Sequence, residues 1–390
     1  AQESRGLGDV YKRQISDIAR VYLRLHLADG VGPITLRRLI ERFGTPQAVL
    51  TASTDRLQAV EGVGPTISRS IREAMHSEQA DREIALAAEH GVRIICPEDD
   101  EYPPLLKHTP DGPICLYVRG RLQPEDGVSL AVVGSRRPSY YGQEQTRRFA
   151  EGLARSGLTI VSGLAYGVDA LAHEGALAGG GRTVAVLGNG LCDVYPPEHL
   201  ALAERIGEAG AVISELPMQT SPDGGNFPRR NRIIAGMALG ALIVEGTERS
   251  GALITARLAN DYNREVFALP GRIDCATSRG PNTLIREGIA RLVTCVADIL
   301  DELGEVGRIL SGRPPQDFAS RDAATPVRTP DLTANEQRVL ASLGIDPMPM
   351  EMVVDGTGLS AAETAAALTL LQLKHLVKQL PGNLFVAVQR

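Results

Sequence analysis

The sequence lacks the features that mark a membrane protein or a protein held together by disulfides or zinc. Its 390 residues contain no apolar run near the roughly 18–20 residues that cross a bilayer, which excludes a membrane-spanning helix. It has five cysteines and no C-x-x-C pair, so neither a zinc site nor a disulfide framework is indicated. We therefore expect no bound metal, and buried cysteine thiols in a cytoplasmic protein.

An excess of positive charge is also missing. The net charge is −6, and basic and acidic residues number nine and nine in residues 15–88, 21 and 27 in 89–303, and four and six in 331–390. This balance argues against a globally basic nucleic-acid binder. A site for a polyanion must therefore be a local cluster of basic residues within an acidic protein.

The chain divides into three patterned blocks and two stretches outside them. Residues 1–14 mix charges and glycines without the apolar stretch of a secretory signal, and we expect them to be non-native or disordered. Residues 304–330 hold Pro314, Pro315 and Pro326 among small polar residues and are predicted to be a flexible linker. The patterned blocks are residues 15–88, 89–303 and 331–390.

Residues 15–88 are predicted to be wholly helical. The segments Gly30-Val31-Gly32-Pro33 and Gly62-Val63-Gly64-Pro65 repeat each other, and each is a tight turn with Pro at the start of the next helix. With these repeated turns the block resembles a tandem helix-hairpin-helix, or SAM-like, module. Such turns also expose backbone N–H groups at a helix N-terminus, which can bind a phosphate oxygen. A DNA contact and a compact helical adaptor both remain open for this block.

Residues 89–303 alternate short β-branched runs with helix-period stretches, which predicts an α/β block with a Rossmann-like, largely parallel sheet. In such a sheet, ligands bind beyond the carboxyl ends of the strands, where the glycine-rich loops of this chain fall. Helices are expected at Gly142–Ser156 and Asp169–Leu177. The predicted strands are Val92–Ile95, Leu130–Val133, Thr159–Val161, Thr183–Leu187, Val212–Ser214, Ala241–Val244 and Val266–Leu269.

Residues 331–390 are predicted to form a winged-helix-like domain. Thr333-x-x-Glu336 and Ser360-x-x-Glu363 have the pattern of capping boxes that open helices. Strands at 377–380 and 384–388 flank the turn Pro381-Gly382-Asn383. The helix expected at 360–373 contains no Arg, although a helix that reads DNA needs side chains for bases and phosphates. We therefore favour a protein-interaction role over sequence-specific DNA reading.

The first glycine loop is typical of phosphate binding. Val133-Gly134-Ser135-Arg136-Arg137 follows a predicted strand and precedes a helix, so it offers backbone N–H groups, a hydroxyl and a guanidinium at a helix N-terminus. It lacks the G-x-G-x-x-G pattern and a well-placed acid about 20 residues further on. A dinucleotide site is therefore disfavoured, and no cofactor is expected.

The densest cluster of basic residues is Asn226-Phe227-Pro228-Arg229-Arg230-Asn231-Arg232. No acidic residue lies between Asp223 and Glu245, which argues against an ordinary helix start with surface salt bridges. Phe227 adds an aromatic ring beside the guanidiniums. Stacked bases and paired phosphates are the means by which single-stranded nucleic acids are commonly bound.

Asp169 and His173 are four residues apart and share a helix face. They could form an acid–base pair, but a side-chain contact that fixes the helix start is favoured.

The order of these motifs resembles that of the DprA/Smf family, DNA-processing protein A. The matching segments are Gly134-Ser135-Arg136; Ser162-Gly163-Leu164-Ala165 with Gly167, Asp169 and Ala172-His173; Ala185-Val186-Leu187-Gly188 with Tyr195-Pro196; Phe227-Pro228 with Arg230-Asn231-Arg232-Ile233-Ile234-Ala235-Gly236; Ser250-Gly251-Ala252-Leu253-Ile254-Thr255-Ala256; Val266-Phe267-Ala268 with Pro270-Gly271; and Asn282 with Leu284-Ile285. Three positions depart from the common pattern. Tyr166 stands where a basic or small residue is frequent, Cys192 where Asp is frequent, and Gly224 where some members have Lys.

The resemblance implies a non-enzymatic protein that binds and protects incoming single-stranded DNA during natural transformation. It also implies RecA recombinase as a partner, which the protein helps to load, and a homodimer formed through the Rossmann-like domain. By matching motifs, the residues expected to line the strand-binding pocket are Gly134, Ser135, Arg136, Gly163, Arg182, Phe227, Arg230, Asn231 and Arg232.

An alternative is an enzyme that processes nucleoside monophosphates, as in the related Rossmann-like phosphoribohydrolases. Those enzymes resemble one another in a Pro-Gly-Gly-x-Gly-Thr-x-x-Glu loop. The corresponding stretch here, Val244-Glu245-Gly246-Thr247-Glu248, lacks the Pro-Gly-Gly lead, which disfavours this function.

Overall fold

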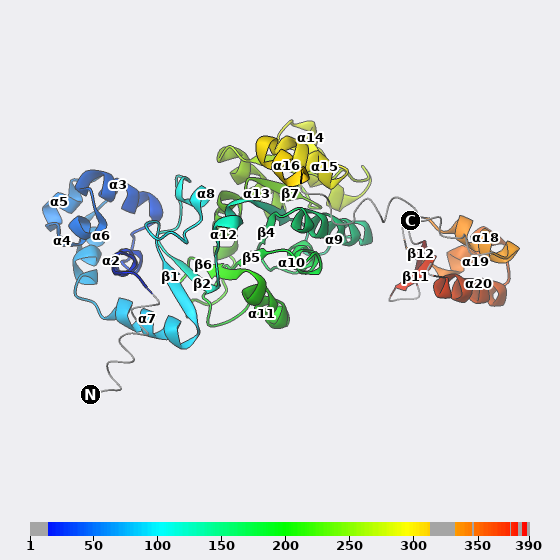
Figure 1. The fold of residues 1–390 in the computed structure, drawn as a ribbon, viewed down its shortest axis with the longest axis horizontal. Helices are drawn as coiled ribbons and strands as arrows, with labels where there is room; N and C mark the ends of the chain where they lie inside the picture. Colours follow the sequence, from blue (N-terminus) through cyan, green and yellow to red (C-terminus); the bar gives the residue numbers. More distant parts are fainter. Residues whose placement is uncertain (1–14, 313–331, 345–346, 375, 381–383, 388–390) are drawn as a thin grey trace. The chain divides into compact units, whose positions relative to one another are not determined.

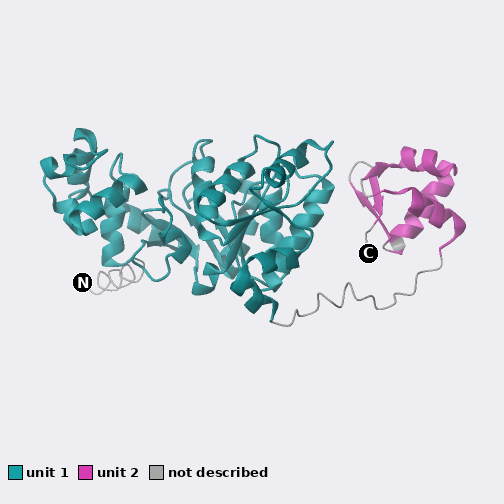
Figure 2. Ribbon diagram, turned by 90° about the horizontal axis from the view of Figure 1, so that it is seen from above, with its two compact units in different colours: residues 1–315 teal, residues 316–390 magenta. Residues whose placement is uncertain are grey.

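The computed structural model describes residues 15–312, 332–344, 347–374, 376–380 and 384–387. The chain forms two compact units, residues 1–315 and 316–390, and each is described here by itself (Figure 2). Residues 1–14 and 313–331, which include most of the expected linker, lie outside the described residues.

The first unit begins with a helical domain, as predicted. In α3 and α6 the first residue is the Pro of a Gly-x-Gly-Pro segment, and Gly32 and Gly64 are the N-cap residues. Gly30 and Gly62 in the preceding turns have φ of 80° and 86°, which a residue with a Cβ rarely adopts. The helices are α2 (Asp17–His26), α3 (Pro33–Phe43), α4 (Pro46–Thr51), α5 (Thr54–Gln58), α6 (Pro65–Ala74) and α7 (Gln79–Glu89).

The strands that follow form one sheet in the order β1-β2-β6-β5-β4-β3-β7-β8-β9 (Figure 1). All neighbours from β6 through β9 pair in parallel, whereas β2 pairs antiparallel with both β1 and β6. The largely parallel sheet is therefore confirmed. Its strands are β1 (Val92–Ile95), β2 (Leu116–Gly120), β3 (Ser129–Val133), β4 (Thr159–Ser162), β5 (Thr183–Val186), β6 (Ala211–Ser214), β7 (Gly240–Ile243), β8 (Glu265–Ala268) and β9 (Arg291–Leu292).

Helices cover both faces of this sheet and bury it. Ile233 and Ile234 of α12 and Leu253 of α13 pack with one set of strand residues, and Phe149 of α9 and Ala172 of α10 pack with another. The helices of this part are α8 (Pro104–Lys107), α9 (Tyr140–Arg155), α10 (Val168–Ala178), α11 (Leu200–Ala209), α12 (Asn226–Met237), α13 (Gly251–Asp261), α14 (Arg279–Arg286), α15 (Val296–Glu302) and α16 (Gly304–Ser311). Short 3₁₀ helices are η1 (Pro124–Gly127), η2 (Pro197–His199) and η3 (Ala276–Ser278).

Strand β2 is absent from the sequence prediction, although each of the seven predicted strands is present within a residue or so of its expected bounds. The reason is topological. β1 and β2 pair antiparallel and are joined by a segment whose only helix is the four-residue α8, so no strand–helix alternation marks β2. β2 lies between β1, the strand that follows the helical domain, and β6, the edge strand of the parallel part of the sheet.

The predicted linker is wrong at its start, because residues 304–311 form helix α16. Leu310 of this helix is buried and packs in the same apolar cluster as Leu300 of α15 and Phe149 of α9. Small and polar residues around this helix gave a linker-like composition, but two apolar side chains one turn apart, Val306 and Leu310, are enough to attach it to the domain.

The second unit has a helical part and a small sheet in the order β10-β12-β11. Both predicted capping boxes are confirmed: the Glu336 amide donates to Thr333 Oγ1 at 3.3 Å, and the Glu363 amide donates to Ser360 Oγ at 3.3 Å. The elements are α18 (Ala334–Ser342), β10 (Met348–Pro349), α19 (Met350–Thr357), α20 (Ala361–Leu373), β11 (Val377–Leu380) and β12 (Leu384–Ala387). The predicted turn at 381–383 lies outside the described residues.

Two further expectations concern cysteines and membranes. All five cysteines are free; Cys96 and Cys115 are buried as expected, but Cys192, Cys275 and Cys295 are only half-buried. Burial raises the pKa of Cys96 to about 12. No helix in the described ranges is long and apolar enough to cross a membrane.

The packing of α16 predicts a local effect on stability. Leu310 is 8% exposed, whereas Ile309 on the same helix is 64% exposed. We expect Leu310→Ala to lower the free energy of unfolding of the first unit by about 2 kcal/mol, because it empties a core position. Ile309→Ala is the control and should change it by less than about 0.5 kcal/mol. Urea denaturation measures both, and equal effects of the two variants would show that residues 304–311 do not pack on the domain.

Candidate nucleic-acid interface

The candidate site lies at the point where the sheet reverses its strand order. The chain runs from β3 to β4, β5 and β6 on one side and then returns to β7 on the other side of β3. The loops that follow β3 and its neighbours therefore diverge and leave a crevice at their carboxyl ends. A cavity of about 460 Å³ lies there, lined by Gly134, Ser135 and Arg136 after β3, by Phe227, Arg230 and Asn231 of α12, and by Thr247 and Ser250 after β7.

Arg230 is a buried cation at the bottom of this cavity. Its side chain is 7% exposed, and Nη1 donates to the carbonyl of Gly163 at 2.6 Å and to that of Val186. Burial lowers the pKa of Arg230 to about 10, and the charge of Asp169 partly opposes this shift. The guanidinium therefore stays charged at neutral pH. Among the described residues, no carboxylate forms an ion pair with it within 4.0 Å.

Gly163 makes room for this guanidinium. A Cβ at Gly163 would lie 2.5 Å from both Cζ and Nη2 of Arg230, a separation that real side chains do not show. The glycine in the loop after β4 is therefore required so that α12 can bring a long cation against the backbone of the loop. Gly188, after β5, has the same relation to Phe227, because its Cβ would lie 2.7 Å from the ring atom Cδ1.

Phe227 and Arg136 form the mouth of the cavity. The guanidinium carbon of Arg136, an exposed side chain, lies 5.6 Å from the centre of the Phe227 ring, within the range of a cation–π contact. The ring of Tyr195, after β5, lies 5.6 Å from the Phe227 ring at an interplanar angle of 31°. An exposed cation and the Phe227 ring thus border a pocket that holds the buried Arg230 and Asp169, and the Tyr195 ring lies beside Phe227.

The loop after β3 is fixed by Glu245, the residue that follows β7 and Val244. Glu245 is buried and accepts hydrogen bonds from the Ser139 amide at 2.8 Å and from Ser139 Oγ at 2.6 Å. Ser139 in turn is the N-cap of α9 and accepts from the Gly142 amide at 3.1 Å. This carboxylate therefore holds the start of α9, and with it the Ser135–Arg136 loop, in place.

Arg232 does not line the cavity, contrary to the prediction. It donates to both carboxylate oxygens of Glu215 and to the carbonyl of Asp111. Both acids are distant in the sequence, so the stretch free of acids from Asp223 to Glu245 gave a false indication of an unpaired cluster. Arg232 lies on a different side of α12 from Arg230 and stabilises the packing of that helix.

Arg182 also lies elsewhere, and its predicted place in the pocket is wrong. It precedes β5, at the amino end of the strand, whereas the cavity lies at the carboxyl ends. Its guanidinium pairs with Asp126, with Nε 2.8 Å from Oδ1 and Nη2 2.9 Å from Oδ2, and donates to two backbone carbonyls. The remaining predicted residues, Gly134, Ser135, Arg136, Gly163, Phe227, Arg230 and Asn231, lie in or directly beneath the cavity.

Asp169 and His173 do not act on each other. Asp169 accepts from the Ala165 amide at 3.4 Å, which ties the loop after β4 to the start of α10, as the favoured interpretation holds. His173 Nδ1 lies 2.7 Å from Thr183 Oγ1, at the beginning of β5. Burial, with the nearby charges of His199 and Arg230, lowers the pKa of His173 to about 3, so the imidazole is neutral.

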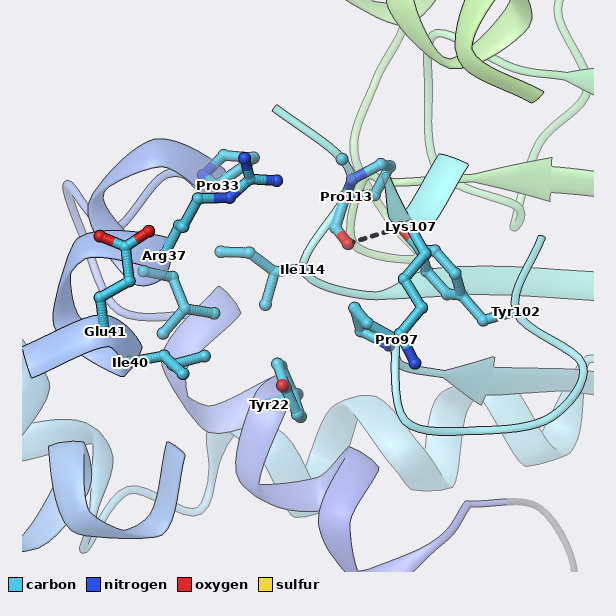
Figure 3. A pocket seen from close by; sticks show the side chains of 12 residues that line it. Tyr22, Pro33, Arg37, Ile40, Glu41, Pro97, Tyr102, Lys107, Pro113 and Ile114 are labelled. Carbon is cyan, nitrogen blue, oxygen red and sulfur yellow. Dashed lines mark hydrogen bonds between the residues drawn. The ribbon is translucent and has the colours of Figure 1, made fainter. Parts of the chain in front are cut away.

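A second cavity lies between the helical domain and the segment between β1 and β2 (Figure 3). It is smaller, about 230 Å³, and Pro33, Ile40, Pro97 and Ile114 give it largely apolar walls. In Figure 3, Arg37 and Lys107 come from opposite sides of it, and Tyr102 Oη donates to the Pro113 carbonyl at 2.8 Å. None of the predicted site residues lines this cavity, so it is not the candidate site.

No sequence pattern predicts a place for Tyr195 or Gly188 at the first cavity. Both stood in motifs that carry the family resemblance, but no local pattern showed that α12 would bring Phe227 against the loop after β5.

Comparisons with known proteins agree with this architecture. A family model described as "DNA recombination-mediator protein A" matches residues 93–304, more than half of the chain. Models described as "DprA winged helix domain" and "SAM-like Helix-hairpin-helix tandem" match residues 323–383 and 24–76. The chain belongs to the DprA/Smf family.

Individual relatives extend over most of the chain. The protein Smf of Synechocystis is 34% identical over 377 residues, which cover 90% of this chain and 94% of that protein. The X-ray structure of DNA processing protein A (DprA) from Streptococcus pneumoniae superposes with a TM-score of 0.63 at 34% identity, over 72% of this chain and 95% of that one. DNA processing protein A from Helicobacter pylori, described with its single-stranded DNA binding mode, has a TM-score of 0.50 at 30% identity, over 54% and 95%.

The ion pair of Arg182 predicts a structural effect of its loss. Asp126 is 3% exposed, and removal of its cation leaves a buried carboxylate without a counter-ion, with only the Thr159 hydroxyl and the Gln123 amide as hydrogen-bond donors. We expect Arg182→Gln to lower the free energy of unfolding of the first unit by about 2–3 kcal/mol. Arg137→Gln, at an exposed arginine beside the cavity, is the control and should leave it unchanged. An unchanged urea midpoint for Arg182→Gln would contradict a structural role for this arginine.

Proposed function

We propose that this chain binds single-stranded DNA in the cavity at the carboxyl ends of β3, β4 and β7. The observation that carries the proposal is Arg230, a buried guanidinium at the cavity. Among the described residues it forms no ion pair within 4.0 Å, although the charge of Asp169 acts on it from the same cavity. A phosphate that enters the cavity supplies a direct anionic partner for this guanidinium. Because the surroundings exclude most water, this attraction is stronger than between exposed groups.

The mouth of the cavity supports a nucleotide strand over an isolated phosphate ion. Phe227 offers an aromatic face for a base, and Arg136 offers an exposed cation for the backbone. Stacking and backbone pairing together bind single strands with little dependence on sequence, because every base has a π-face. Few cations take part, which fits a chain whose net charge is −6.

The wider role proposed here follows from membership of the family and from its relatives. The Helicobacter pylori relative is described as a single-stranded DNA-binding protein, and the family model is described as a recombination mediator. We propose that this chain acts in the cytoplasm, protects incoming single strands during natural transformation and helps to load RecA recombinase on them. We also propose that it works as a homodimer through the Rossmann-like domain, without catalysis.

The geometry gives no support to the alternative of a nucleoside-monophosphate enzyme. Asp169 and His173 have separate partners, Glu245 is bound to Ser139, and Glu248 is exposed on the loop before α13. None of these groups is hydrogen-bonded to another of them, so the described residues show no acid–base pair of the kind that the alternative needs. Release of free base from AMP, lost in Glu248→Gln, is the result that would favour the enzyme.

Arg136 gives a direct test of strand binding. We expect fluorescence anisotropy with labelled oligothymidine to show salt-dependent binding, and Arg136→Ala to weaken it about tenfold or more, because a charge-assisted contact is lost. The slope of log affinity against log salt concentration should fall by about 0.7, the value for one phosphate contact of a single strand.

The control for Arg136→Ala is Arg257→Ala, which removes the same charge from the exposed face of α13. It should bind like the wild-type chain. Equal affinity and slope in the two variants would remove the cavity from consideration as the DNA site.

Gly163 gives an independent test, because it contributes no charge. In Gly163→Ala the new methyl group displaces the Arg230 guanidinium. We expect the affinity for oligothymidine to fall about tenfold, as in Arg230→Ala, and the double variant to bind no more weakly than Arg230→Ala alone. Circular dichroism and the urea midpoint show whether the variant is folded. Additive losses in the double variant would mean that Gly163 does not act through Arg230.

A further inference from the structure

Aromatic side chains continue the mouth of the cavity across the loops after β4 and β5. Phe227 lies beside Tyr195, and Tyr166 lies beside His199 with ring centres 5.2 Å apart in an edge-to-face arrangement. Tyr195 and Tyr166 are 41% and 43% exposed. The chain has no tryptophan and only nine tyrosines and six phenylalanines, so this gathering of rings on one rim is not a general property of its surface.

Hydrogen bonds hold the outer rings in place. Tyr166 Oη donates to Glu198 Oε2 at 2.6 Å, and His199 Nδ1 lies 2.8 Å from the Leu164 carbonyl. Glu198 and His199 follow Tyr195 by three and four residues, so Tyr166 contacts the same short segment that carries Tyr195. Leu164 has a left-handed φ of 57°, a conformation that residues other than glycine seldom adopt. The loop is thus kept in one shape although its tyrosine is exposed.

Packing of the core does not explain why aromatic side chains stand at positions 166 and 195. The rings of Tyr166 and Tyr195 contribute little to the core at this exposure. An exposed row of fixed aromatic rings beside a charged pocket is suited to flat, apolar ligands joined by a charged backbone. Bases of a single strand have these properties.

We propose that Tyr195, Tyr166 and His199 form a stacking track for the bases that follow the nucleotide held at Phe227 and Arg230. The single strand then leaves the cavity across the loops after β5 and β4, away from β7. This inference rests on the proposed function and adds the direction of the strand and the residues that hold it. The track binds by stacking, because Glu198 beside it is acidic and brings no cation to the phosphates.

Binding of labelled oligothymidine to the full chain at a series of salt concentrations tests the track. Because stacking releases no counterions, we expect Tyr195→Ala and Tyr166→Ala each to lower the affinity about tenfold while the slope against salt stays that of the wild-type chain. Tyr195→Phe and Tyr166→Phe keep the ring and should restore most of the affinity. Both tyrosines are exposed, so the variants should fold, and the urea midpoint checks this.

Tyr141→Ala is the matched control. Tyr141 is also an exposed tyrosine of this rim, but its Oη donates to the Pro270 carbonyl after β8, on the other side of β7. It should bind like the wild-type chain. A loss for Tyr141→Ala with none for Tyr195→Ala and Tyr166→Ala would overturn the proposed direction of the strand.

A tryptophan gives a second readout, since the 390-residue sequence has none. In Tyr195→Trp the single indole should be quenched when oligothymidine is added, because a stacked base lies against it. Phe43→Trp, at a ring that Arg56 covers in the helical domain, is the control and should not change. If oligothymidine binds with loss in Arg136→Ala but the Tyr195→Trp signal and the alanine variants are unaffected, the track is wrong and the proposed function stands. If the wild-type chain does not bind at all, the proposed function itself fails.

Discussion

The site depends on one buried charge, the guanidinium of Arg230 against the carbonyls of Gly163 and Val186. Removal of a cation from water is unfavourable unless its donors find acceptors, and here backbone oxygens after β4 and β5 supply them. This contact also constrains the residues around it. It demands a glycine at 163, it fixes the start of α12, and it places Phe227 over Gly188. Backbone carbonyls, rather than a carboxylate within ion-pair distance, accept the hydrogen bonds of this guanidinium, and its charge remains available to a ligand.

The arginines of α12 show why a count of charges describes this site poorly. Successive residues of a helix point about 100° apart, so Arg229 is exposed, Arg230 enters the cavity and Arg232 pairs with Glu215 and Asp111. Three arginines of one sequence cluster therefore lie in three different surroundings: solvent, the cavity and an ion pair. The cavity itself has Arg230 and Arg136 as its cations, and aromatic rings extend it along the rim. An acidic chain can bind a polyanion in this way, with stacking in place of additional charge.

The helical domain is part of the same unit as the sheet, although its sequence pattern is separate. Its buried residues share an apolar cluster with Ile94 of β1 and Tyr117 of β2. Arg37 donates to the Thr109 carbonyl at 2.5 Å, and Glu83 accepts from the Met218 amide at 2.5 Å. Glu83 therefore links this domain to the segment between β6 and α12. The helical domain is therefore connected through packed residues to the segment that precedes α12, the helix that carries Arg230 into the cavity.

The sequence alone determined the helical, parallel-sheet and winged-helix-like blocks, because hydrophobic periodicity, capping boxes and glycine turns are local signals. It also placed Ser135, Arg136, Phe227 and Arg230 at one rim, since parallel strands bring their carboxyl ends together. Tertiary structure alone decided which arginines are available. Arg182 and Arg232 are neutralised by Asp126 and Glu215, acids 56 and 17 residues away, and no local pattern reveals such pairs. The same is true of β2 and Tyr195, because burial and contact depend on which distant segments pack against each other.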